Sequence, residues 1–236
     1  MPSRKSGPTG AARTLAKIDL FAAMGEAQRK AIEARCQWRE YPQGASVIDR
    51  ESPDTDVYFV VAGRVRVLIH SESGREVAFD EMGPGACVGE IAAIDGSPRT
   101  ASVEAIEPTL CAILTRQTFL DVTVTSPATT IALLKRMAAM LRTSTERILD
   151  LSTLGAHNRV YAEILRLAKP GADGRPAIRP IPVHSDLAAR VSTTRETVAR
   201  VFSELSRANV VIKERDALVV AAPARLKAMV REFKTA

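Results

Sequence analysis

The change of hydrophobic period at Pro127 is the feature that most limits the folds open to this chain. Before it, short strand-like runs alternate with turns, and after it no glycine or proline interrupts residues 128–154. In that stretch apolar and small side chains recur at alternating steps of three and four, which predicts a helix with a coiled-coil seam. The seam positions are Ile131, Leu134, Ala138, Leu141, Thr145, Ile148 and Ser152. The helix is expected to pair with a second copy of the chain; the alternative is that it packs on its own domain.

The region before this helix predicts a small β domain. Helical patterning from Leu15 to about Cys36 is followed by six strand-like runs, which are separated by turn signals. The runs are residues 46–48, 57–61, 65–69, 76–79, 101–105 and 109–114. Many short strands at this spacing favour a barrel or β-roll. We expect a disordered tail over 1–14, the β domain over 15–126 and a dimerisation helix over 127–154.

The segment from Gly89 to Ser102 combines residue types that suit a ribose phosphate. It holds Glu90, a short apolar run, Arg99 and several hydroxyls. Backbone N–H groups at the start of a one-turn helix over 91–94 can bind an anion, and Arg99 can add paired, charge-assisted hydrogen bonds. Glu90 can accept a hydrogen bond from a ribose hydroxyl, and glycine allows close approach of the backbone to a ligand. The alternative is a polar turn beside a surface arginine.

Residues 184–205 predict a helix-turn-helix. A hinge is expected at 155–158 and a helix at 159–168, before a proline-rich loop or edge strand over 171–183. Ser185 can cap a short helix that ends at Arg190. A turn at Ser192 and Thr193 leads to a second helix from Thr194 to about residue 206, and this geometry is typical of the motif.

The second helix and the segment after it carry the residues expected to contact DNA. Arg195, Glu196 and Arg200 lie on the exposed face, where arginine can bind guanine and glutamate can accept from cytosine. Residues 210–220 predict a β-hairpin wing, in which Lys213 and Arg215 can contact phosphates. The alternative is that these charges only solvate the surface.

Composition agrees with a polyanionic partner and argues against several other classes. The 33 basic and 27 acidic residues give a net charge of +6, whereas aromatic residues are only 4% and disfavour a platform for single-stranded nucleic acid. The three cysteines show no metal-binding spacing, so a cytoplasmic location and no metal are expected. No apolar stretch reaches about 18 residues, so no membrane partner is expected. No nucleophile–base pair or Walker loop indicates an enzyme.

Together these motifs resemble the cyclic AMP receptor protein and catabolite-activator (Crp-Fnr) family of bacterial transcription regulators. The resemblance covers about residues 15–222. It is carried by residues 57–79, by Gly-Glu-Ile-Ala at 89–92 with Pro-Arg-Thr-Ala at 98–101, and by Arg-Glu-Thr-Val-Ala-Arg at 195–200. It implies an α+β fold with an N-terminal cyclic-nucleotide-binding β-roll, a long central dimerisation helix and a C-terminal winged helix-turn-helix over 155–236.

The resemblance also implies the ligand site. Arg99 and Thr100 would hold the cyclic phosphate and Glu90 the ribose, while Ser144 and Thr145 would meet the purine, one of them in the partner subunit. The expected ligand residues are Val67, Gly89, Glu90, Ile91, Ala92, Arg99, Thr100, Ser144 and Thr145. Cyclic AMP is the expected effector, with no cofactor. Thr100 leaves cyclic GMP open, because a threonine after the arginine is associated with that nucleotide in the regulatory domains of eukaryotic kinases.

The same resemblance implies the DNA site. The expected DNA-contacting residues are Thr194, Arg195, Glu196, Arg200, Lys213 and Arg215. They would read palindromic TGTGA-type operators as a homodimer, and RNA polymerase would be a further partner.

Two positions depart from the family pattern. Ser192 stands where the turn usually has glycine, and Met140 stands where the central helix often has an arginine that reaches toward the ligand site. A non-nucleotide input, through haem or redox chemistry, is one alternative on the same fold, although no N-terminal cysteine group is present and His70, His157 and His184 are poorly placed. A second alternative is a nucleotide-binding module that acts on a protein partner.

Overall fold

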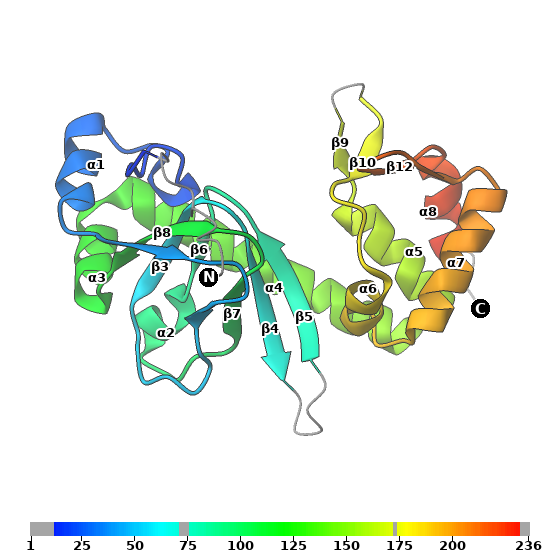
Figure 1. Ribbon diagram of the computed structural model, residues 1–236, viewed down its shortest axis with the longest axis horizontal. Coiled ribbons are helices and arrows are strands. Elements are labelled where there is room, and N and C mark those ends of the chain that lie inside the picture. Colours follow the sequence, from blue (N-terminus) through cyan, green and yellow to red (C-terminus); the bar gives the residue numbers. More distant parts are fainter. Residues whose placement is uncertain (1–11, 71–75, 172–173, 232–236) are drawn as a thin grey trace, which may run out of the picture. The chain divides into compact units, whose positions relative to one another are not determined.

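The computed structural model describes residues 12–70, 76–171 and 174–231, and the chain divides into two units, Met1–Ala139 and Met140–Ala236 (Figure 1). Each unit is described by itself. Most of the expected N-terminal tail lies outside the described residues. At its end, the Thr14 hydroxyl donates to Glu33 Oε1 over 2.9 Å, and Leu15 is fully buried.

The first unit is built on two four-stranded antiparallel sheets. Their orders are β1-β8-β3-β6 and β2-β7-β4-β5. The strands are β1 (Gln37–Tyr41), β2 (Ser46–Ile48), β3 (Val57–Ala62), β4 (Val65–His70), β5 (Glu76–Met82), β6 (Cys87–Val88), β7 (Ser102–Ala105) and β8 (Thr109–Leu114). The prediction of a β domain made of short strands is confirmed, and all six expected runs are strands.

Helices cover one of these sheets. The short η1 (Asp19–Phe21), α1 (Glu26–Glu33) and α3 (Arg116–Thr125) pack against β3 and β8, with Phe59 in contact with two further rings. Its centroid lies 5.1 Å from that of Phe21 and 6.5 Å from that of Phe119. A second core fills the space between the sheets. Cys111 is buried there, and burial raises the pKa of its thiol to about 12, which agrees with a structural role.

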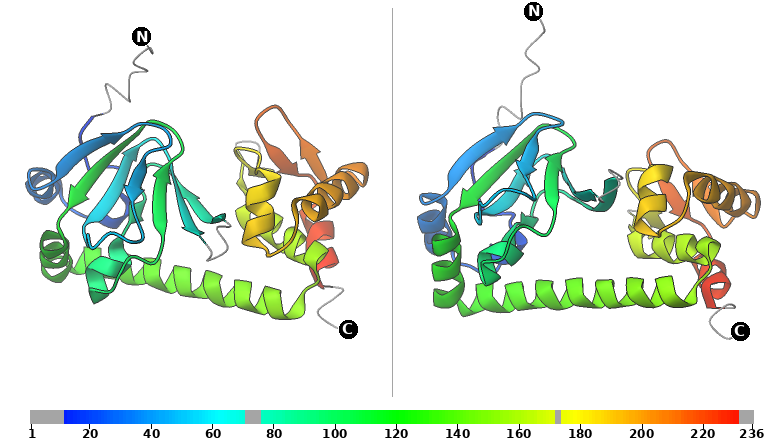
Figure 2. Two further views of the ribbon diagram at one scale, coloured as in Figure 1. Left: turned by 60° about the horizontal axis from the view of Figure 1, so that its bottom comes forward. Right: turned by 90° about the horizontal axis from the view of Figure 1, so that it is seen from below.

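The long helix α4 (Pro127–Thr153) is uninterrupted, as its lack of glycine and proline predicts (Figure 2). Pro127 occupies the first helical position, where its missing N–H costs nothing. Thr129, Arg136, Thr143 and Asp150, which are spaced by seven residues, are buried or half-buried. The seam positions are all exposed, so the seam covers a face distinct from the one that α4 turns toward its own chain. Neither α4 nor any other described helix is long and apolar enough to span a membrane.

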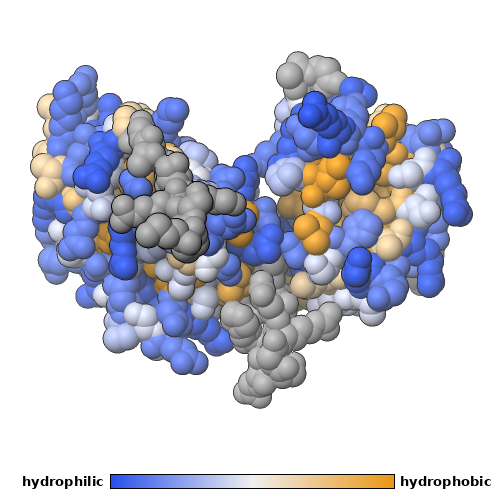
Figure 3. All heavy atoms as spheres, viewed as in Figure 1, coloured by the Kyte–Doolittle hydropathy of each residue, from blue (hydrophilic) through white to orange (hydrophobic). Residues whose placement is uncertain are grey.

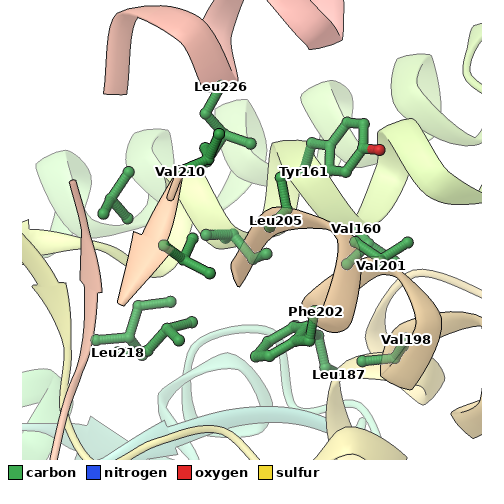
Figure 4. Close-up of a cluster of buried hydrophobic side chains, with 14 of the residues drawn as sticks. Val160, Tyr161, Leu187, Val198, Val201, Phe202, Leu205, Val210, Leu218 and Leu226 are labelled. Atoms are coloured by element: carbon green, nitrogen blue, oxygen red, sulfur yellow. The ribbon is translucent and has the colours of Figure 1, made fainter. Parts of the chain in front are cut away.

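The second unit is a winged helix-turn-helix, as predicted. Its elements are α5 (Ala156–Leu167), β9 (Lys169–Pro170), β10 (Pro176–Ile178), α6 (His184–Arg190), α7 (Arg195–Arg207), β11 (Val211–Lys213), β12 (Leu218–Val220) and α8 (Pro223–Arg231). The strands form an antiparallel sheet in the order β11-β12-β10-β9. Leu187 of α6, Phe202 and Leu205 of α7 and Val160 of α5 meet in one core (Figure 4). Apolar positions three and four residues apart on α7 therefore turn inward, which leaves its polar face outside.

Three local predictions are wrong. The expected hinge at 155–158 is reduced to its first residue, because α5 begins at Ala156 and Asn158 is buried within it. Ser185 does not cap α6: the helix begins at His184 with Val183 at the N-cap, and the Ser185 hydroxyl donates to Asp186 instead. The segment 171–183 contributes β10, which lies between β12 and β9 rather than at an edge.

Ser192 keeps the backbone conformation for which glycine is usual, with φ of +51°. Since an L-residue in this region is disfavoured, Ser192→Gly is expected to raise the free energy of unfolding by about 0.5–1 kcal/mol. Urea unfolding of the two proteins measures the change. Ser203→Gly, the same substitution at an exposed position inside α7, is the control and should lower stability. Equal destabilisation by both substitutions would contradict the assignment of strain to Ser192.

Candidate functional site

Arg99 follows the short helix α2 (Glu90–Asp95) in sequence, and its side chain reaches back to the start of that helix. Its Nη1 donates to the carbonyl oxygen of Gly89 over 2.9 Å, and its Nη2 donates to Asp54 Oδ2 and to the Asp56 carbonyl, both over 2.8 Å. Only 2% of the side chain is exposed. The alternative of a surface arginine beside a polar turn is therefore wrong.

Gly89 lets the guanidinium come this close to the backbone. Its φ is +86°, and a Cβ atom at this position would lie 2.5 Å from Arg99 Nη1 and 2.9 Å from the Asp56 carbonyl oxygen. A side chain would therefore be strained and would also displace Arg99. Gly89 is therefore the N-cap of α2 and also leaves the space that the Arg99 guanidinium fills.

One donor of Arg99 remains available. Its Nε is buried and has no hydrogen-bond partner among the described residues. Leaving a buried donor unsatisfied costs about 1–3 kcal/mol, and such a group in a native structure calls for an explanation. An acceptor group on a bound ligand would satisfy this donor.

Asp54 balances the charge of Arg99. Burial by itself would raise the pKa of the Asp54 carboxyl, but hydrogen bonds from the Asp56 backbone, the Tyr58 hydroxyl and Arg99 outweigh this effect and lower the pKa. The Tyr58 ring also lies 5.9 Å from the Arg99 guanidinium carbon. The Asp54 carboxylate is thus ionised at neutral pH. An incoming phosphate would compete with it for the hydrogen bonds of the Arg99 guanidinium.

Glu90 has a partner that sequence reasoning missed. Arg136 of α4 donates from Nε to Glu90 Oε1 over 2.8 Å and from Nη2 to the Cys87 carbonyl over 2.7 Å. The Glu90 side chain is only 4% exposed, so the ion pair is largely removed from water. Arg136 lies one turn before Met140, the position without the expected arginine. The sequence offers one hint, an arginine one turn before Met140 on the same helix, but it does not distinguish Arg136 from the other arginines of α4.

The other expected ligand residues are divided between the two units. Ile91 and Ala92 lie on α2 with Gly89 and Glu90, Thr100 is exposed next to Arg99, and Val67 is half-buried on β4. The structure thus brings Gly89, Glu90 and Arg99 together at α2. Ser144 and Thr145 lie in the second unit and are exposed on α4, where the Thr145 hydroxyl donates to the Leu141 carbonyl.

The expected DNA-reading residues lie on one face of α7. Thr194 caps this helix by accepting a hydrogen bond from the Thr197 N–H over 3.2 Å. Arg195, Glu196 and Arg200 are exposed on the side opposite the buried stripe. Figure 3 shows one face of the molecule, which is mainly hydrophilic and also exposes hydrophobic groups on the second unit.

The wing adds two exposed cations. Lys213 is the last residue of β11, and Arg215 lies in the turn between β11 and β12. The acidic residues of the same turn are paired: Arg175 Nη2 lies 3.0 Å from Glu214 Oε1, and Arg179 Nε lies 3.6 Å from Asp216 Oδ2. Because these arginines offset the two carboxylates, the wing presents net positive charge.

Comparisons with known proteins agree with this architecture. The model of the cyclic nucleotide-binding domain matches residues 38–126, and the model of the Crp-like helix-turn-helix domain matches residues 158–229. A cyclic AMP receptor protein of Thermus thermophilus is 33% identical over 175 residues, which cover 74% of this chain and 79% of that protein. The cAMP-activated global transcriptional regulator CRP of Salmonella typhimurium is 27% identical over 190 residues, 79% of this chain and 90% of that one.

Solved structures show the same fold. The catabolite activator protein of Thermus thermophilus matches 91% of this chain and 99% of its own, with a TM-score of 0.54 and 28% identity. A CooA mutant of Carboxydothermus hydrogenoformans matches 90% of this chain and 95% of its own, with a TM-score of 0.76 and 17% identity. The second likeness is one of fold alone.

A cyclic nucleotide-binding domain joined to a Crp-like helix-turn-helix defines a transcription regulator. This chain belongs to the CRP/FNR family of such regulators, as its resemblance implied. The family consists of transcription regulators rather than enzymes.

Proposed function

We propose that this protein is a homodimeric transcription factor whose affinity for DNA depends on cyclic AMP. The buried guanidinium of Arg99, fixed at the start of α2 with an unsatisfied Nε, is the observation that carries the proposal. A cyclic phosphate at this point would accept hydrogen bonds from Arg99 and from the free N–H groups in the first turn of α2. Glu90 would accept from the ribose 2′-hydroxyl, since a carboxylate can accept several donors in addition to Arg136.

The seam of α4 supports a dimer. Ile131, Leu134, Leu141 and Ile148 are 52%, 57%, 68% and 65% exposed in the single chain. A continuous apolar stripe of this kind is costly in water and is covered when two such helices pair. Pairing would also bring Thr145 of each subunit to the interface, where its hydroxyl would reach the purine bound by the partner.

Titration calorimetry with cyclic AMP and with cyclic GMP tests the choice of effector. Cyclic AMP should bind with one site per subunit. Thr100 is exposed beside Arg99, so its hydroxyl is available to the guanine amino group of cyclic GMP. If cyclic GMP binds more tightly than cyclic AMP, it is the effector. If neither nucleotide binds, the input of this regulator is a different one, such as haem or a redox signal.

The exposed face of α7 would read the operator. Arg195, Glu196 and Arg200 would contact one TGTGA-type half-site, while Lys213 and Arg215 of the wing would bind the flanking phosphates. Two-fold symmetry would set the recognition helices about 34 Å apart, one turn of DNA. DNA bound in this way would place the regulator beside RNA polymerase, the further partner that the family resemblance implies.

Arg195→Ala should weaken operator binding by about 1–3 kcal/mol and relax the preference at one guanine, because a bidentate contact to that base is lost. Fluorescence anisotropy with single-base variants of the operator measures both effects. Lys213→Ala is the control, since loss of a phosphate contact should weaken all sequences alike and reduce the salt dependence. An unchanged preference in the Arg195 variant would remove this residue from base recognition.

A further inference from the structure

The imidazole of His184 lies close to two of the residues expected to contact DNA. His184 is the first residue of α6 and is half-buried. Its ring packs on Phe202 of α7, with the two ring centroids 4.9 Å apart and the planes at 57°. Phe202 belongs to the core of the second unit, so this contact fixes the imidazole relative to α7 (Figure 4). Among the described residues, no group makes a hydrogen bond or an ion pair with either ring nitrogen of His184.

Two cations act on this ring from different elements. Partial burial lowers the pKa of His184, and the positive charges of Arg195 of α7 and Lys213 of β11 lower it further. Asp186 and Glu196, the acids in the first turns of α6 and α7, do not reverse this effect. In the free protein a mostly neutral imidazole therefore lies beside two cations at neutral pH.

DNA would invert the electrostatics of this cluster. Backbone phosphates that flank the base read by Arg195, or that bind Lys213, bring negative charge close to the ring. An opposite charge favours the protonated imidazole, and neutralisation of the two cations removes the repulsion that opposes protonation. The imidazolium would in turn donate a charge-assisted hydrogen bond to a phosphate oxygen. The pKa of His184 is thus expected to be higher in the DNA complex than in the free protein.

We propose that His184 binds a DNA backbone phosphate as an imidazolium, so that each subunit takes up one proton when it binds the operator. The proton remains on the imidazole and no other bond is made or broken. Since a protonated ring is favoured only in the complex, operator affinity rises as the pH falls through the ordinary pKa of histidine. The rise ends once the free protein is protonated as well. The inference rests on the proposed function in taking DNA as the ligand of α7 and the wing.

Operator affinity measured against pH tests this proposal. Anisotropy is recorded with the operator duplex at saturating cyclic AMP and constant salt. The affinity of the dimer should rise about tenfold or more between about pH 8 and about pH 5.5. The salt dependence should also be steeper at the lower pH, by about one phosphate contact per subunit. An affinity that stayed constant over this range would overturn the proposal.

Variants at the ring assign the effect to His184. His184→Gln keeps a hydrogen-bond donor but takes up no proton, so it should hold the affinity of the high-pH protein throughout. His184→Lys carries a permanent charge and should bind as tightly at about pH 8 as the unmodified protein does at low pH. Thermal unfolding verifies that both variants are folded. A full pH dependence in folded His184→Gln would overturn the assignment.

His157→Gln is the matched control. The His157 side chain is 40% exposed in the same unit, and its Nδ1 lies 4.0 Å from Glu204 Oε2. This substitution removes a second titrating imidazole and should leave the pH dependence of operator affinity unchanged. Loss of the pH dependence in His157→Gln, with no loss in His184→Gln, would transfer the effect to His157 and overturn the proposal.

Proton NMR provides a readout that does not depend on the folding of a His184 variant. Spectra of His70→Gln and His157→Gln assign the remaining imidazole signal to His184. Its pKa should lie below the ordinary value in the free protein and above it in the operator complex, and equal values would overturn the proposal. A protein that bound no DNA at any pH would defeat the proposed function and this inference with it. Operator binding without proton uptake would defeat this inference alone.

Discussion

Arg99→Leu is expected to lower the affinity for cyclic AMP about 100-fold or more and to abolish the effect of the nucleotide on DNA binding. The substitution removes charge-assisted hydrogen bonds to the phosphate, which contribute about 1.5–3 kcal/mol each. It also leaves Asp54 without its main cationic partner. Titration calorimetry measures the loss, and the binding of unrelated DNA should remain unchanged because α7 and the wing are intact.

Two further variants make this experiment specific. Arg50→Leu removes the same charge from an exposed position of the same domain and should leave nucleotide affinity within about twofold. Arg99→Lys should give an intermediate loss, because lysine keeps the charge but not the paired donors. Thermal unfolding verifies that the variants are folded. If folded Arg99→Leu bound cyclic AMP as the unmodified protein does, the phosphate would lie elsewhere.

Leu141→Asp should convert the protein into a monomer at micromolar concentration and reduce operator affinity about 1000-fold. Leu141 is the most exposed of the large apolar seam residues, at 68%, and a charge at this position would face its own copy across the seam. A monomer binds one half-site of the operator. The gain in affinity that comes from binding both half-sites at once is therefore lost. Sedimentation velocity measures the assembly and anisotropy measures the affinity.

The control for this prediction is Ala139→Asp, which adds the same charge at an exposed position outside the seam. It should leave both the dimer and its operator affinity intact. The seam would be contradicted if Leu141→Asp remained dimeric, or if both variants dissociated equally.

The periodicity of apolar residues along the sequence predicted the elements that bury one regular face. The six strand-like runs, α4 and α7 follow from the alternation of apolar residues, because each of these elements buries a regular face. β10 (Pro176–Ile178) was predicted only as a loop or an edge strand, because its three residues lie among prolines and pair with β12, more than 30 positions away in sequence. Strand pairing over such distances leaves no local signal.

The charged contacts of the sites are only partly predictable. The ligand-binding segment from Gly89 to Ser102 was recognised because its residues are close together in sequence. The Arg136–Glu90 pair was not, since α4 carries several arginines and only the packing of the chain decides which of them reaches α2. The expected capping by Ser185 failed for a similar reason: Val183 already starts α6, and a local preference gave way to the position of the helix.

Operator binding in the presence and absence of nucleotide tests the central claim most directly. A labelled TGTGA–N6–TCACA duplex is titrated with the protein alone, with cyclic AMP and with cyclic GMP, and anisotropy is recorded at constant salt. The account predicts that cyclic AMP strongly raises the affinity for this duplex and leaves the affinity for a scrambled duplex nearly unchanged. Identical isotherms with and without either nucleotide would contradict it.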